Sequence, residues 1–255
     1  MTPEFLAALE KARADKRPVV AATQLPSGEQ CLLPDPAAPA ALNEIARKVL
    51  ESDVSGTHKV DGVDWFMHAY NPPLRLVIVG AVHIAQALVQ FSTHCGFATT
   101  VVDPRRSFAS DERFPNVTIS TAWPDEAMEA FQPDSRTAVV TLTHDPKLDD
   151  PALDRALKSE AFYIGALGSR RTHAARLGRL RDLGHSDQSM TRIRGPVGLN
   201  IEAVTAPEIA ASIIAEIIAV RRGAPQPAKS APVLAKLAPA VLAKLAPPVM
   251  AKPAQ

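Results

Sequence analysis

The chain has 255 residues, of which 46% are apolar, and its 28 basic and 27 acidic side chains give a formal net charge of +1. This composition excludes general disorder, and the balanced charge gives no reason to expect nucleic-acid binding. Because the sequence has neither an apolar run of about 18 residues nor a signal-peptide stretch near Met1, we expect a cytoplasmic protein without a membrane-spanning helix.

Residues 1–71 are predicted to form a small α+β unit. Apolar residues recur at helical spacing over residues 40–51, and residues 57–68 predict a hairpin around the Asp61-Gly62 turn. A further helix is expected over residues 3–14, and strands are expected over 18–24 and 30–33. The rigid segment Asn71-Pro72-Pro73 follows, so the sequence predicts a domain boundary at this point.

Residues 72–223 predict a second domain in which strands and helices alternate. The predicted strands cover residues 74–79, 98–102, 117–120, 137–142 and 162–164. The predicted helices cover residues 82–95, 125–131, 151–159, 169–183 and 207–222, the last with Thr205 as its N-cap. Alternation of this kind is typical of an α/β fold with a doubly wound parallel sheet, and we predict a Rossmann-like domain after the small N-terminal unit.

Residues 224–255 predict a flexible tail rich in proline, alanine and lysine. An eight-residue unit repeats through Val233–Pro239 and Val241–Pro247, and its proline ends any helix after about two turns. We therefore expect the tail to have no independent fold.

Ligands of a doubly wound sheet bind beyond the carboxyl ends of its strands, so residues that follow the predicted strands are the candidates for a site. After the first strand, Gly80, Val82 and Ala85 occupy the three glycine positions of a dinucleotide fingerprint, with His83 among them. The branched side chain of Val82 would hinder a pyrophosphate. The pattern therefore fits either a nucleotide site or a Rossmann core without a tightly bound dinucleotide.

The loops after two later strands add acidic and basic candidates. Asp103 stands 23 residues after Gly80, where an acid would bind a ribose hydroxyl, and Arg105 follows it. After the strand at 137–142, His144 is either an acid/base group or a structural loop residue, and Asp145 precedes Pro146 as in an Asx turn.

The segment from Gly165 to Arg171 is the sharpest signal in the sequence. Gly165 and Gly168 bend the chain, Ser169 is suited to capping a helix, and Arg170 and Arg171 occupy the first helical turn. Backbone amides and arginine forks at a helix N-terminus favour a phosphate or carboxylate. The alternative is a solvated basic face that continues along the helix through Arg176, Arg179 and Arg181.

Residues 72–222 resemble the Rossmann domain of the XdhC/CoxI family of xanthine dehydrogenase accessory proteins. The resemblance is carried by residues 77–83, 101–105, 142–146, 163–173, 195–199 and 207–210, among which Gly-Ala-Leu-Gly-Ser-Arg-Arg is highly specific. It implies a chaperone-like factor that binds the molybdopterin form of the molybdenum cofactor, promotes its sulfuration and helps to load it into an enzyme. The implied partners are a molybdenum hydroxylase such as xanthine dehydrogenase and, as further candidates, a cysteine desulfurase and a second copy of the chain in a homodimer.

The leading hypothesis is thus a non-catalytic accessory protein that binds the phosphate-bearing pterin in the strand-end crevice. The alternatives are an NAD-dependent oxidoreductase with a degenerate fingerprint, using His144 as its acid/base group, and an interaction domain whose site has decayed. We predict no metal site, because no histidine pair has the spacing of a zinc site and the two cysteines, Cys31 and Cys95, are too few for a thiolate cluster.

Overall fold

The structure is a computed structural model that describes residues 2–225. The chain forms two compact units, the first ending at Pro73 and the second beginning at Leu74. The repeats of the predicted tail lie outside the described residues. Within those residues, no helix combines the length and the apolar character needed to cross a membrane.

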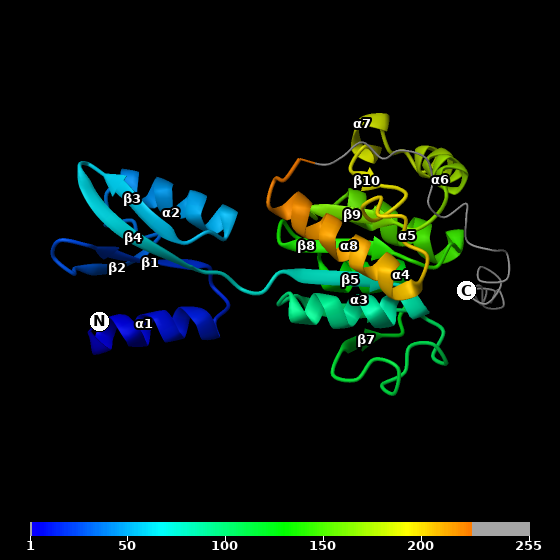
Figure 1. Ribbon diagram of the computed structural model, residues 1–255, viewed down its shortest axis with the longest axis horizontal. Coiled ribbons are helices and arrows are strands. Elements are labelled where there is room, and N and C mark those ends of the chain that lie inside the picture. Colours follow the sequence, from blue (N-terminus) through cyan, green and yellow to red (C-terminus); the bar gives the residue numbers. More distant parts are fainter. Residues whose placement is uncertain (1, 226–255) are drawn as a thin grey trace. The chain divides into compact units, whose positions relative to one another are not determined.

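The first unit is a four-stranded antiparallel sheet in the order β2-β1-β4-β3, with one helix on each face (Figure 1). Side chains alternate between the two faces of a strand. On β1, Val20 therefore packs with Leu42 of α2, whereas Val19 packs with Leu9 of α1. The elements are α1 (Pro3–Ala14), β1 (Val19–Gln24), β2 (Gln30–Leu33), α2 (Ala40–Ser52), β3 (Gly56–Val60) and β4 (Val63–Tyr70).

The second unit is a six-stranded parallel sheet in the order β10-β9-β8-β5-β6-β7, which is the doubly wound arrangement that the sequence predicted. Its strands are β5 (Arg75–Val79), β6 (Ala98–Val102), β7 (Thr118–Ser120), β8 (Thr137–Thr141), β9 (Tyr163–Ala166) and β10 (Ile193–Arg194). Its helices are α3 (His83–His94), α4 (Pro124–Phe131), α5 (Pro146–Leu157), α6 (Arg170–Asp182), α7 (Asp187–Met190) and α8 (Ala206–Arg221).

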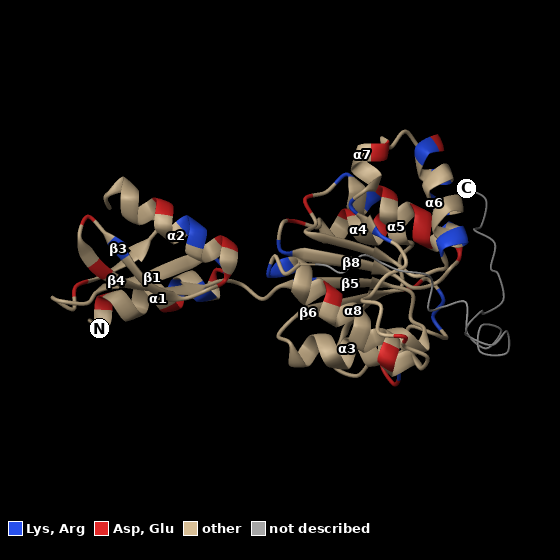
Figure 2. Ribbon diagram, turned by 45° about the horizontal axis from the view of Figure 1, so that its top comes forward, with Lys and Arg blue, Asp and Glu red and all other residues tan. Residues whose placement is uncertain are grey.

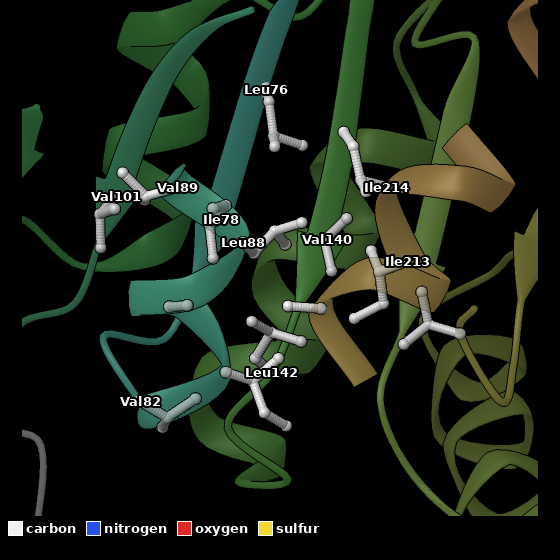
Figure 3. Packing of buried hydrophobic residues seen from close by; sticks show 14 of the residues in the cluster. Leu76, Ile78, Val82, Leu88, Val89, Val101, Val140, Leu142, Ile213 and Ile214 are labelled. Atoms are coloured by element: carbon white, nitrogen blue, oxygen red, sulfur yellow. The ribbon is translucent and has the colours of Figure 1, made fainter. Parts of the chain in front are cut away.

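Helices cover both faces of this sheet, with α3 and α8 on one face and α4, α5 and α6 on the other (Figures 1 and 2). On the central strand β5, Leu76 and Ile78 join the cluster under α3 and α8, while Val77 and Val79 join the opposite cluster. Figure 3 shows the first of these clusters, which is continuous from β5 to α8. A central strand buried on both faces explains why its sequence is a continuous apolar run.

Three elements differ from the sequence prediction, among them the short helix α7, which the sequence did not predict. Helix α5 begins at Pro146 rather than at residue 151, because Asp145 caps it and proline suits the first helical position. Pro151 lies within this helix instead of starting it. The third difference is β10, a two-residue strand beside β9 that is too short to show any periodicity in the sequence.

Gly80 offers a test of how tightly the turn after β5 is built. Its φ is 111°, and a Cβ at this position would stand 2.6 Å from Cγ2 of Thr143. We expect Gly80→Ala to lower the free energy of unfolding by about 2–4 kcal/mol, since it combines a left-handed backbone with a steric overlap. Urea denaturation measures the change.

Gly178 provides the matched control, because it lies within α6 and a Cβ there would meet nothing within 4 Å. Gly178→Ala should raise stability by about 0.5–1 kcal/mol, since alanine is the better helix former. If the two substitutions changed the free energy of unfolding equally, the turn at Gly80 would not be constrained by its backbone conformation and its contact with Thr143.

Candidate functional site

Three loops meet at the carboxyl edge of the second sheet, around the point where the strand order reverses between β5 and β8. Residues 80–82 follow β5, residues 142–145 follow β8, and residues 167–169 follow β9. Gly80 contacts the second loop closely, since a Cβ there would also stand 3.3 Å from the backbone nitrogen of Thr143. This edge is where doubly wound proteins bind their ligands.

In the first loop, the residue at the second fingerprint position faces inward. Val82 is 6% exposed and belongs to the same hydrophobic cluster as Leu142. Figure 3 shows both side chains at one end of that cluster. His83, by contrast, is exposed as the first residue of α3. The loop therefore offers His83 to a ligand, while Val82 acts as part of the core.

Asp103 lies at the end of β6, as predicted, but its carboxylate is fully buried and serves the protein itself. Oδ2 accepts a hydrogen bond from the amide of Ala81 at 2.8 Å. Arg105 reaches both oxygens, with Nε 2.8 Å from Oδ1 and Nη2 2.6 Å from Oδ2. Asp103 thus fastens the turn after β5 to the loop after β6, and both of its oxygens already have donors.

Sequence reasoning missed a second clamp on this turn. Nη1 of Arg113 donates to the carbonyl oxygen of Ala81 at 2.8 Å and to that of Phe108 at 2.7 Å, and Nη2 reaches Gln86 at 3.2 Å. Arg113 lies in the irregular segment between β6 and β7, where no periodicity could have marked it. The backbone of the first loop is therefore held from two sides.

The second loop carries the candidates His144 and Asp145. Asp145 caps α5, since its Oδ1 accepts from the amide of Lys147 at 2.9 Å. His144 is half-buried with a φ of 61°, and burial together with the nearby Arg176 guanidinium lowers the pKa of its imidazole. His144 is accordingly uncharged at neutral pH and can donate or accept one hydrogen bond through each ring nitrogen.

Sequence reasoning also missed a buried ion pair that contacts these loops. Asp149 and Arg176 are each 1% exposed, and their closest side-chain atoms lie 3.3 Å apart. Oδ1 of Asp149 also accepts from the hydroxyl of Thr143 at 2.7 Å. Burial raises the pKa of Asp149 to about 6, against the opposing effect of Arg176. Arg176 is therefore not part of a solvated basic face, and that alternative is wrong for this residue.

The third loop carries the glycines, the capping serine and the two arginines of the predicted anion site. Gly168 has a φ of 144°, and Gly165 packs so closely on Tyr163 that a Cβ would stand 2.8 Å from its ring. Ser169 caps α6 by accepting the amide of Thr172 at 3.1 Å. Arg170 and Arg171 follow as exposed residues in the first turn, and Figure 2 shows basic residues at both ends of this helix.

The group implied by the sequence can be tested against these residues. A phosphate fits the third loop, because amides of the first turn of α6 and a buried guanidinium beside Gly168 supply donors and positive charge. Within residues 2–225, no group of three or more His, Cys, Asp or Glu side chains is placed to hold a metal ion.

Comparison with known proteins places this geometry in a family. Residues 76–217 match the model of the XdhC Rossmann domain. The chain is 35% identical over 156 residues to PaoD, a molybdenum cofactor insertion chaperone of Escherichia coli, which corresponds to 61% of this chain and 43% of PaoD. It is 31% identical over 184 residues to a Bacillus subtilis protein named as a probable subunit of xanthine dehydrogenase, or 72% of this chain and 53% of that protein.

A solved structure agrees with these matches. A crystal structure described as a xanthine dehydrogenase from Bacillus halodurans superposes with a TM-score of 0.66 at 25% identity, covering 89% of this chain and 66% of the other. The chain thus spans only about half the length of the curated relatives named above. The matched segment runs from β5 to α8 and contains all three loops of the carboxyl edge. By this match, which covers more than half of its residues, the chain belongs to the XdhC family.

Proposed function

We propose that the protein is an accessory factor in the maturation of molybdenum-cofactor enzymes of the xanthine dehydrogenase type. In this role it binds the phosphate-bearing pterin cofactor at the carboxyl edge of the second sheet and assists its sulfuration or insertion. The names of the relatives support the general role, since one is a molybdenum cofactor insertion chaperone and another is named as part of a xanthine dehydrogenase.

The observation that carries the proposal is the start of α6. Cations near a helix N-terminus oppose the helix dipole, yet Arg170 and Arg171 both occupy the first turn, where the structure has no acidic residue. A bound phosphate reverses this penalty, because it interacts favourably with the helix end and with both guanidinium groups. A bound phosphate ester would therefore stabilise the first turn of α6 more than contact with water alone.

The remaining candidates belong to the same carboxyl edge of the sheet. Gly165, Gly168 and Ser169 shape the loop, and His83 and His144 stand on the neighbouring loops as groups that can hydrogen-bond a pterin ring. When bound, the cofactor supplies the molybdenum on which the client enzyme depends. The protein itself contributes binding and orientation, and we assign it no catalytic residue.

Sulfuration requires a sulfur donor, and the cysteines bear on its source. Cys31 is half-buried, and burial together with Glu29 and Asp35 raises the pKa of its thiol. Because the thiolate is the reactive form, Cys31 is a poor sulfur carrier at neutral pH. We therefore propose that sulfur comes from a partner such as a cysteine desulfurase. A homodimer is a further proposal, which the mass in solution tests.

The alternative function is an NAD-dependent oxidoreductase with His144 as its acid/base group. It would need an acid at the end of β6 to hold the ribose, but the buried Asp103 already bonds Ala81 and Arg105. We expect NAD to bind only with a dissociation constant on the order of millimolar. Calorimetric titration measures this, and micromolar binding by the natural chain would support the oxidoreductase instead.

The predicted anion site is tested by the double substitution Arg170→Ala and Arg171→Ala. It should weaken binding of the pterin phosphate by about 1–3 kcal/mol, the usual scale for charge-assisted hydrogen bonds. Lysine at both positions should recover part of the loss, since it keeps the charge without the planar fork. Readouts are the pterin content of purified protein and the activity of a molybdenum hydroxylase produced with it.

Arg181→Ala is the matched control, because Arg181 lies in the last turn of the same helix and pairs with the exposed Asp187 at 2.6 Å. It should leave pterin content and hydroxylase activity unchanged. If the double alanine variant behaved like this control, the predicted anion site would not bind the cofactor.

A further inference from the structure

Arg176 has more hydrogen-bond donors than the protein uses. Its guanidinium carries five N–H groups. Nη2 donates to the carbonyl oxygen of Leu167 at 2.8 Å and lies 3.3 Å from Oδ2 of Asp149. Nε and Nη1 are buried, and neither has a hydrogen-bond partner among residues 2–225. Unsatisfied buried donors on a cation are costly, so their presence calls for a partner outside the protein.

These donors lie at the third loop. A Cβ on residue 168 would stand 3.8 Å from Nη1 of Arg176, and Gly168 directly precedes the N-cap of α6. The same Cβ would stand 3.1 Å from the side chain of Thr172, so the turn at Gly168 packs closely over Nη1 and the first turn of α6. A buried cation and the amides of a helix N-terminus thus converge on one turn of the chain.

The charges around Arg176 come from three elements. Helix α5 contributes Asp149 and Asp150, helix α6 contributes Arg179, and the loop after β8 contributes His144. Asp150 is engaged by Arg179, which bonds both of its oxygens. His144 is uncharged at neutral pH for the reasons given above. Asp149 is therefore the counter-ion that an incoming anion would have to replace.

We propose that Arg176 is the buried cation of an oxyanion site beneath Gly168, and that a bound phosphate or sulfate takes the place of Asp149 as its counter-ion while the Asp149 carboxylate accepts one proton from solvent. The proposal deepens the proposed function, since it concerns the anion site assigned to the pterin phosphate. Thr143 keeps Asp149 in place through the hydroxyl hydrogen bond, which an oxygen of either the carboxylate or the carboxylic acid can accept.

The direction of the pH effect follows from the state of Asp149. Burial raises its pKa to about 6, so its carboxyl group is mostly protonated below that pH and mostly ionised above it. In the protonated form, Asp149 no longer neutralises the charge of Arg176, so an anion binds to that form more strongly. Between about pH 7.5 and about pH 5.5, the protonated fraction rises from about 3% to about 76%, so sulfate binding should strengthen roughly 25-fold.

The experiment titrates sulfate into the full chain at these two pH values. Sulfate is the probe because it is tetrahedral and does not itself titrate in this range. The natural chain should bind sulfate about 25-fold more tightly at the lower pH. Asp149→Asn should bind at the higher pH as tightly as the natural chain does at the lower one. Asp150→Asn is the matched control, a neighbouring acid paired with Arg179, and should keep the natural pH response.

Two measurements keep the proposal open to refutation if Asp149→Asn does not fold. Calorimetry of the natural chain in two buffers of different ionisation enthalpy should show proton uptake with sulfate, and Arg176→Gln should abolish both the uptake and the binding. Any one of three results would overturn the proposal. These are sulfate binding without proton uptake, no sulfate binding at the lower pH, and a natural pH response in a folded Asp149→Asn variant. Sulfate binding as predicted without any pterin would instead contradict the proposed function alone.

Discussion

The buried carboxylate of Asp149 is the contact on which the carboxyl edge of the second sheet depends. One oxygen holds the hydroxyl of Thr143 in the loop after β8, and the other faces Arg176, which in turn holds the carbonyl of Leu167 in the loop after β9. Removing either charge would leave the other buried without a counter-ion, which typically costs about 3–5 kcal/mol. Two loops that are distant in sequence therefore keep one relative position.

Buried acids join distant segments at two other places in the second unit. Asp103 joins the turn after β5 to the loop after β6 through Ala81 and Arg105. Glu216 of α8 is fully buried and accepts from the hydroxyl of Tyr163 at 2.7 Å and from the amide of Gly198 at 2.8 Å, which fixes the loop after β10. Each of these buried acids accepts a hydrogen bond from a segment distant in sequence, so the segments are tied together before any ligand arrives.

Much of this fold could be predicted from the sequence, because its signals are local. Apolar runs marked the central strands, and Thr205 and Ser169 were recognisable as caps that the structure confirms. The interactions of Arg113 and Arg176 were invisible, since each joins groups that only the folded topology brings together. Asp103 was found at the expected place, but its internal bonds depend on an amide 22 residues earlier. Position along the chain thus identified the loops at the carboxyl edge, whereas the partners of their charged groups required the structure.

The packing of α8 also has a consequence for the order in which the chain is made. Ile209, Ile213 and Ile217 of this helix complete the cluster formed by Ile84 and Leu88 of α3 with the central strands. During synthesis the apolar face of α3 emerges more than a hundred residues before its cover, and it stays open to water until residues 206–221 have left the ribosome. Any nascent chain halted before that point presents a hydrophobic surface of the kind that cellular chaperones bind.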